Sequence, residues 1–150
     1  MQLNNLWGKK MKNKVLFWII QLTWNLLENI LGLFVFLFLI IIGKKPKKYH
    51  RCVRFEIGEN YGGFNVAWCI VTHKNPSDYL LKHEHGHFIQ ALIFGPFEIL
   101  IQLISIIRYW YRVLIVKLHI KKEYELPGYY SIWFEKQASD LGYKYIDAKF

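Results

Sequence analysis

The run His83-Glu84-His85-Gly86-His87 contains the pattern His-Glu-x-x-His. Because His83 and His87 are four positions apart, a helix places both imidazoles on one face. Two imidazoles at this spacing can hold one Zn²⁺, with Glu84 beside a metal-bound water as its general base. The pattern therefore predicts hydrolysis assisted by a metal ion. The simpler alternative is a solvated histidine cluster without a catalytic metal.

A catalytic zinc site also needs a third protein ligand and an open position for water. Ile93 stands where a third histidine would follow in the extended form of the motif, so the third ligand must come from elsewhere. Glu135 lies in a later predicted helix and fits this role. Three rival ligands are left open, and they are His73, His119 and Asp140.

This combination, His-Glu-His-Gly-His with a later Glu135-x-x-Ala138, resembles the gluzincin metallopeptidases. It is closest to small membrane-bound bacterial members and to the CAAX-prenyl-protease type, over about residues 50–142. The resemblance implies that His83, His87 and Glu135 bind Zn²⁺ and that Glu84 is the catalytic general base. It also implies a peptide or protein substrate, whose peptide bond is hydrolysed by Glu-assisted attack of zinc-bound water.

The sequence departs from the gluzincin pattern at one position of the second motif. That pattern continues Glu-x-x-Ala-Asp, with the aspartate on a ligand histidine, but here Ser139 occupies the position and Asp140 comes one later. A serine can accept an imidazole N–H, but it lacks the carboxylate's charge and makes the histidine less basic. A non-catalytic zinc-binding membrane protein, a sensor or structural subunit derived from a peptidase, is therefore the alternative function. Gln90, three residues after His87, is a further candidate for supporting the site.

Hydrolysis of an amide passes through a tetrahedral oxyanion, which needs a donor besides the metal. The candidate donors are Tyr124, Tyr129, Tyr130 and His119. With ten tyrosines in the chain, the sequence does not choose among them.

Two apolar runs upstream of the motif are predicted to form strands. Residues 49–57 and 64–72 are rich in aromatic and branched side chains and flank a Gly-Glu-Asn-Tyr-Gly-Gly turn. Pairing as a hairpin would place Cys52 opposite Cys69, near disulfide distance, although reduced thiols are expected if the domain is cytoplasmic.

Three helices are predicted after these strands. Ser77 or Asp78 can cap the active-site helix over residues 79–94, and Gly95-Pro96 ends it. The apolar residues 97–120 are expected to form a further helix, half buried or dipping into a membrane. A last helix, over about residues 131–142, carries the third ligand.

Residues 15–42 are rich in apolar side chains, with no polar one after Asn29, and are long enough to cross a bilayer. This predicts an uncleaved transmembrane anchor, although Gln21, Glu28 and other polar residues lie in its first half. The net charge of +9 comes largely from basic clusters that flank this stretch. Such clusters suit lipid headgroups and argue against nucleic acid as the partner. Four basic residues precede the stretch and six follow it closely, which favours a cytoplasmic catalytic part.

The composition, 53% hydrophobic over 150 residues, excludes a disordered chain. The predicted strands and helices together make an α+β fold. Its expected parts are a transmembrane helix, a β-hairpin or small sheet, a zincin-like active-site helix, an apolar helix and a C-terminal helix. The expected organisation is a basic tail (1–14), a transmembrane anchor (15–42) and a zincin-like metallopeptidase domain (43–150). We expect a membrane protein with a single N-terminal anchor and a possible second membrane-associated helix at 97–120.

Overall fold

The structure is a computed structural model, and it describes residues 13–59 and 61–146. Most of the predicted basic tail, residues 1–12, therefore lies outside the described residues. The helices are α2 (Lys14–Trp24), α3 (Leu26–Ile41), α4 (Asp78–Phe94), α5 (Glu98–Lys117) and α6 (Trp133–Tyr145). The strands are β1 (Lys47–Tyr49), β2 (Cys52–Glu56), β3 (Gly63–Val66) and β4 (Cys69–Thr72).

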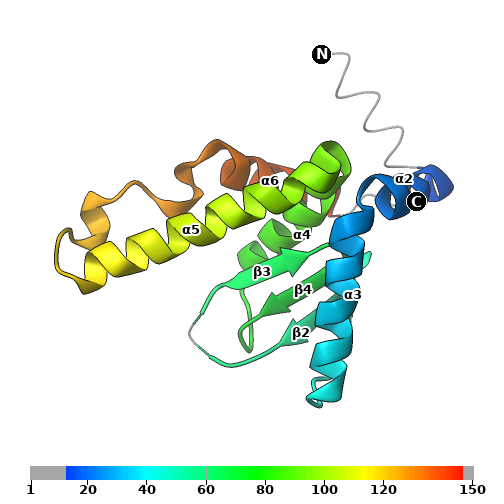
Figure 1. The fold of residues 1–150 in the computed structure, drawn as a ribbon, viewed down its shortest axis with the longest axis horizontal. Coiled ribbons are helices and arrows are strands. Elements are labelled where there is room, and N and C mark those ends of the chain that lie inside the picture. The colour runs from blue at the N-terminus through cyan, green and yellow to red at the C-terminus, as the bar shows by residue number, and fades with distance from the viewer. Residues whose placement is uncertain (1–12, 60, 147–150) are drawn as a thin grey trace.

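The expected α+β class is confirmed, and the small sheet lies beside helices (Figure 1). Its strand order is β1-β2-β4-β3, so β3 is an edge strand. β2 and β4 run parallel in the middle, whereas β1 and β3 pair antiparallel with them. The sheet is therefore mixed.

The predicted hairpin between residues 49–57 and 64–72 is wrong, because each predicted strand itself folds into a tight hairpin. His50 (φ 49°) lies in the turn between β1 and β2, and Ala67 (φ 52°) lies in the turn between β3 and β4. Neither turn contains a glycine, so the usual sequence signal for a positive φ is missing. Val53, not Cys52, pairs with Cys69.

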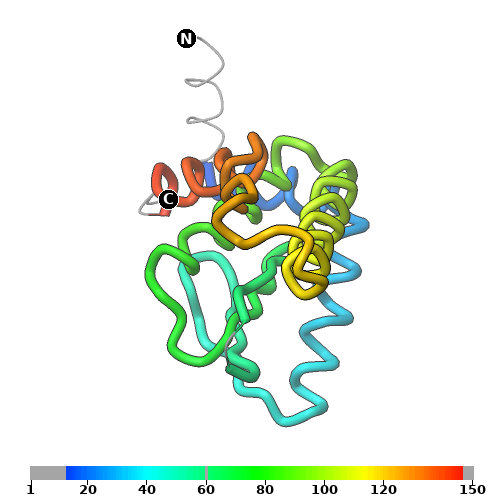
Figure 2. The backbone as a smooth tube through the Cα atoms, turned by 90° about the vertical axis from the view of Figure 1, so that its left-hand side faces the viewer, coloured from blue at the N-terminus to red at the C-terminus, as the bar shows by residue number. Residues whose placement is uncertain are grey.

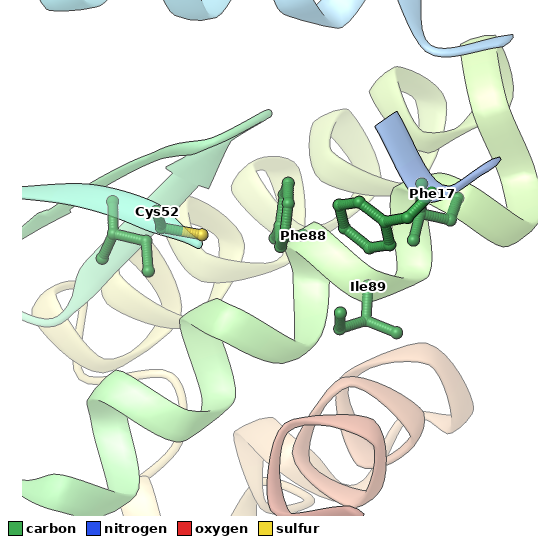
Figure 3. Packing of buried hydrophobic residues seen from close by; sticks show 6 residues of the cluster. Phe17, Cys52, Phe88 and Ile89 are labelled. Atoms are coloured by element: carbon green, nitrogen blue, oxygen red, sulfur yellow. The ribbon is translucent and has the colours of Figure 1, made fainter. Parts of the chain in front are cut away.

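The sheet is packed between α3 on one face and α4 on the other. Cys52 and Ile70 join Phe17 and the α4 residues Phe88 and Ile89 in one buried cluster (Figure 3). Phe55, Cys69 and Val71 pack against Leu39 of α3 in a second cluster. The two cysteines are free thiols in different clusters, so the suggested disulfide is not formed.

The expected single transmembrane helix over residues 15–42 is replaced by two helices, α2 and α3, bent by 88° at Asn25. Asn29 Nδ2 donates to Gln21 O at 2.5 Å, and Gln21 Nε2 donates to Asn29 Oδ1 at 3.4 Å. These bonds tie the two helices together across the bend. Phe17 of α2 is buried against Phe88, so this helix belongs to the core.

The helices α4 and α5 follow one another around Gly95 (φ 56°), where the chain turns. The predicted helix over 79–94 is confirmed, with Ser77 Oγ accepting from Leu80 N at its start. By length and composition, the stretch Asp78–Lys117 could cross a membrane, and α2 with α3 could do so only as a bent pair. Figure 2 shows the backbones of α5 and α3 on the same side of the molecule.

Candidate metal centre

Helix α4 carries the motif, and its ligand face points toward α6. His83, Glu84 and His87 are all buried. α6 approaches α4 closely because Gly86 has no side chain: a Cβ there would lie 1.7 Å from the Ala138 carbonyl oxygen. On α6, a Cβ at Gly142 would likewise lie 1.8 Å from Lys82 O. This contact brings Glu135, one turn before Ser139 on α6, onto the two histidines.

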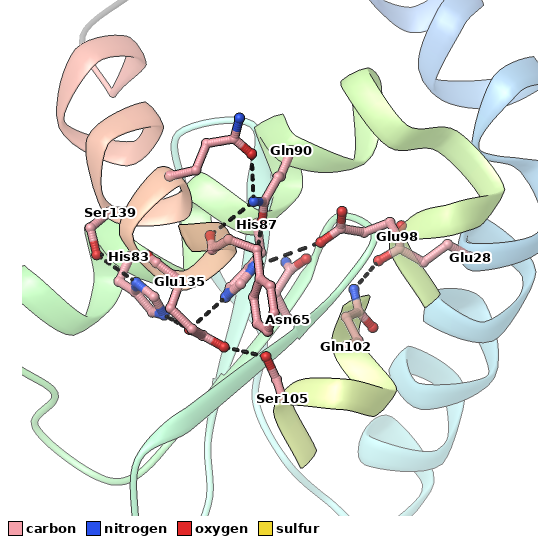
Figure 4. A network of polar contacts seen from close by, with 12 residues as sticks. Glu28, Asn65, His83, His87, Gln90, Glu98, Gln102, Ser105, Glu135 and Ser139 are labelled. Atoms are coloured by element: carbon pink, nitrogen blue, oxygen red, sulfur yellow. Dashed lines mark hydrogen bonds and ion pairs between the residues drawn. The ribbon is translucent and has the colours of Figure 1, made fainter. Parts of the chain in front are cut away.

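Glu135 meets both histidines through one carboxylate oxygen. Its Oε2 lies 3.1 Å from His83 Nε2 and 3.5 Å from His87 Nε2 (Figure 4). One ligand atom from each residue lies within 4.8 Å of the others, and all three side chains are buried. Among the described residues, this buried trio could hold a metal ion.

The ring of His83 is oriented by Ser139. Ser139 Oγ donates to Glu135 O at 3.2 Å, so it can accept the Nδ1–H of His83, which lies 2.9 Å away. A proton on Nδ1 leaves the Nε2 lone pair free to face Glu135. Tyr79 OH also lies 3.2 Å from Ser139 Oγ. Ser139 thus takes the orienting position that the gluzincin pattern gives to an aspartate.

The ring of His87 is oriented by Gln90, whose own hydrogen bonds determine which of its side-chain atoms faces the ring. Gln90 Nε2 donates to Phe134 O at 2.9 Å and to Gln137 Oε1 at 2.8 Å. Its Oε1 must therefore accept, and it takes the Nδ1–H of His87 at 2.9 Å. His87 Nε2 is then the ring nitrogen that faces Glu135. Burial alone would lower the pKa of His87, but its contacts with Glu135 and Glu98 raise that pKa well above the usual range, so the ring carries a proton in the metal-free protein.

His83 Nε2, His87 Nε2 and Glu135 Oε2 consequently converge on one point inside the protein. Glu135 Oε2 has no hydrogen-bond partner, while Ser105 Oγ donates to Glu135 Oε1. Burial alone would raise the pKa of Glu135, but its contacts with His83 and His87 outweigh burial and hold that pKa well below its usual range. An ionised carboxylate buried this deeply needs a positive charge beside it, either a protonated imidazole or a metal ion that takes the proton's place.

Glu84 and two tyrosines lie beside this centre, in a cavity of about 1120 Å³. Gly63 of β3 leaves room for the Glu84 carboxylate, since a Cβ there would lie 3.0 Å from Glu84 Oε1. Tyr129 and Tyr130 line the same cavity. Burial, followed by the nearby Glu84 carboxylate, raises the pKa of Tyr130 to about 12, so its hydroxyl remains a donor.

The rival candidates lie elsewhere. Asp140 and His119 are exposed, and His73 Nδ1 lies 3.3 Å from Gly62 O, outside the ligand group. Neither His119 nor the exposed Tyr124 lines the cavity. The structure therefore brings Glu135 to the two histidines and none of the three rivals.

Sequence reasoning missed a set of polar residues on α5 that face the site. Glu98, Gln102 and Ser105 are spaced at i, i+4 and i+7, which places them on one helix face. Glu98 Oε1 lies 3.6 Å from His87 Nδ1, and Ser105 contacts Glu135. Their periodic spacing within the otherwise apolar first half of α5 was the signal that could have identified them.

Comparisons with known protein families, with curated proteins and with solved structures found no match to this chain. The functional argument is therefore made from the geometry of the site.

Proposed function

We propose that this chain is a membrane-associated, zinc-dependent peptidase of the gluzincin type. The observation that carries the proposal is the convergence of His83 Nε2, His87 Nε2 and Glu135 Oε2, three buried atoms of the kinds that bind zinc. Glu84 lines the cavity onto which this cluster opens.

The donor set suits zinc. Two imidazole nitrogens and one carboxylate oxygen are the ligands of many catalytic zinc sites. A tetrahedral ion with ligands at about 2.0–2.1 Å holds them about 3.3 Å apart, and Glu135 Oε2 lies 3.1 and 3.5 Å from the two nitrogens. The buried described residues also include four glutamates and no lysine or arginine. Burial raises the pKa of two of them, Glu84 and Glu98, and a divalent cation at the cluster would favour their ionised forms.

The residues around the cluster can take separate roles in the hydrolysis of a peptide bond. When bound, zinc would polarise the scissile carbonyl and lower the pKa of a water molecule. Glu84 takes a proton from the attacking water, whose oxygen bonds to the carbonyl carbon. As the C–N bond breaks, Glu84 passes that proton to the leaving amine. Tyr130, protonated at neutral pH, donates to the developing oxyanion.

The cavity offers a place for an extended peptide. β3 is an edge strand, paired with β4 on one side, and its residues 63–66 line the cavity. An unpaired strand edge can add a peptide as a further strand, with backbone hydrogen bonds supplying affinity. A peptide in that position would pass Glu84 and the metal cluster.

The polarity of the helices supports association with a bilayer. α3 buries Glu28 and Asn29 while exposing Phe34 and Phe38, and α5 buries Glu98 while exposing a row of isoleucines and leucines. This is the reverse of a helix in a water-soluble protein, whose apolar side faces the core. Polar residues that face inward from an apolar helix are typical of membrane proteins. Basic residues directly after α3 suit anionic headgroups.

The test combines metal content with peptide hydrolysis, using the full chain purified in detergent. We expect one zinc per chain in the wild type and in Glu84→Gln, and cleavage of a fluorogenic peptide library only by the wild type. Glu135→Ala should lose zinc. Glu59→Gln, at an exposed glutamate paired with Lys74, is the matched control and should keep both properties.

Ser139 favours a second candidate, the non-catalytic zinc-binding protein, because a neutral hydroxyl rather than a carboxylate contacts His83. One zinc per chain with no turnover of any peptide would establish that candidate. Cleavage by Glu84→Gln at the wild-type rate would refute the mechanism, and a wild type without zinc would refute both candidates.

A further inference from the structure

A second carboxylate, that of Glu98, faces the other ring nitrogen of His87. Glu98 Oε1 lies 3.6 Å from His87 Nδ1, while His87 Nε2 faces Glu135. Glu98 is 0% exposed, and neither of its carboxylate oxygens has a hydrogen-bond partner. The turn at Gly95 brings this first residue of α5 back onto α4.

The two ligand histidines therefore have different partners behind them. His83 Nδ1 meets Ser139, a neutral hydroxyl, whereas His87 Nδ1 meets the Gln90 amide and, beyond it, the Glu98 carboxylate. A carboxylate behind a ligand histidine orients the ring and raises the basicity of the nitrogen that binds the metal. In this chain the carboxylate stands behind the second histidine of the motif and the hydroxyl behind the first.

We propose that Glu98 is a positioning residue for His87, supplying from α5 the carboxylate that Ser139 does not supply at His83. The inference rests on the metal site proposed above. Its action is through the imidazole, since Glu135 and not Glu98 belongs to the group of ligand atoms.

The surroundings of Glu98 support a role of this kind. A buried carboxylate without hydrogen bonds is strongly destabilising unless a positive group lies nearby. No lysine or arginine is among the buried described residues. The imidazole of His87, made more positive when it binds a cation, is the group that Glu98 faces.

The test measures zinc affinity by competition with a chromophoric chelator, and the absorption spectrum of the Co²⁺-loaded protein, in detergent. Glu98→Gln should weaken zinc affinity by about 10- to 100-fold and shift the Co²⁺ bands, while retaining one metal per chain at saturation. Glu98→Asp, which keeps the charge, should lose less. Ser139→Asp added to Glu98→Gln should restore at least part of the affinity, by returning a carboxylate to the site.

Glu28→Gln is the matched control for loss of a buried charge. Glu28 is also 0% exposed, but its Oε1 accepts from Ala67 N at 2.9 Å and from Gln102 Nε2 at 2.5 Å. This variant should alter the melting temperature of the metal-free protein without a comparable loss of zinc affinity.

Two results would overturn the inference while leaving the metal site intact. One is wild-type zinc affinity in Glu98→Gln, and the other is an equal loss of affinity in Glu28→Gln. If Glu98→Gln fails to fold, Glu98→Asp becomes the test, because its shorter side chain moves the carboxylate away from His87. Wild-type zinc affinity together with unchanged Co²⁺ bands in that variant would then overturn the inference as well. A wild-type chain that binds no metal would overturn both this inference and the proposed function.

Discussion

Gly86 of α4 and Ala138 of α6 lie so close together that no side chain fits between them. A Cβ built on Gly86 would lie 1.7 Å from the Ala138 carbonyl oxygen. Glu135 lies less than one turn before Ala138 on the same helix, so this contact determines how far its carboxylate is from His83 and His87. The glycine inside the motif is therefore a structural requirement of the metal cluster.

Gly86→Ala should separate α4 from α6 and weaken the metal site. Relieving the overlap requires a backbone shift, which we expect to cost about 3 kcal/mol of unfolding free energy. Zinc affinity should fall with it, because Glu135 moves away from the histidines. Denaturant unfolding and chelator competition measure the two effects. Gly128→Ala is the control, since a Cβ there meets nothing within 4 Å; equal effects of the two substitutions would contradict the packing argument.

Removing the metal should lower thermal stability. A ligand that binds only the folded state at about 100 times its Kd adds about 2.7 kcal/mol, or about 5–10 °C in Tm for a chain of this length. We expect a chelator to lower the Tm of the zinc-loaded wild type by that amount and added zinc to restore it. Thermal scans of Glu135→Ala should show no such difference; a chelator effect of wild-type size in this variant would remove Glu135 from the site.

The class of the fold could be predicted from the sequence, but the strand topology could not. Apolar runs bounded by turn residues located the strands, and Ser77 and Gly95 bounded α4 correctly. The two tight hairpins turn at His50 and Ala67, which adopt a positive φ without being glycine. The Ala67 turn packs against α3, where Gly32 lies beside Val66 O and Ala67 and Glu28 Oε1 accepts from Ala67 N. These are tertiary contacts, which no local pattern predicts.

The residues of the site could be predicted from the sequence where they lie close together on one helix. They could not be predicted where segments distant in the sequence meet. His83, Glu84 and His87 share one helix, so their relation was visible from the motif. Glu98 reaches His87 only because the chain turns at Gly95. The pair Gly95-Pro96 predicts where α4 ends, but no local pattern specifies the direction in which the chain continues. The polar residues Gln21 and Glu28 were attributed to a membrane anchor, whereas they face inward around the bend at Asn25.

Glu135 should contribute to the loss of unfolding free energy at acidic pH. Its pKa is held well below the usual range in the folded protein, so between the two pKa values the unfolded chain binds a proton that the folded chain does not. Its contribution is fully present above the unfolded pKa of about 4.3 and is lost as pH falls toward the folded pKa. Urea unfolding of the metal-free protein between neutral and acidic pH measures this. The stability difference between wild type and Glu135→Gln should shrink below about pH 4.5, and parallel curves would exclude the contribution.

Tyr130→Phe should reduce turnover without removing the metal. The ring of Tyr130 lies edge-on to His83, with centroids 4.8 Å apart, and its hydroxyl remains protonated at neutral pH. Loss of an oxyanion donor typically lowers kcat by about 100-fold or more. Steady-state kinetics should show a lower kcat, with KM and zinc content near wild type. Tyr129→Phe, also in the cavity, is the comparison; a larger kcat loss there would assign the donor role to Tyr129.

The exposed apolar side of α3 should govern binding to lipid. Phe34 and Phe38 are 67% and 60% exposed, and each phenyl ring buried in a bilayer would contribute about 2 kcal/mol. Phe34→Glu combined with Phe38→Glu should therefore reduce binding to mixed phosphatidylcholine and phosphatidylglycerol vesicles by about 100-fold or more. Flotation of the detergent-purified protein after reconstitution measures it. Tyr124→Glu, at a residue 77% exposed outside α3, is the matched control and should float like the wild type. If the double variant floats as well as the control, α3 does not face the bilayer, and its apolar side must be covered by another part of an assembly.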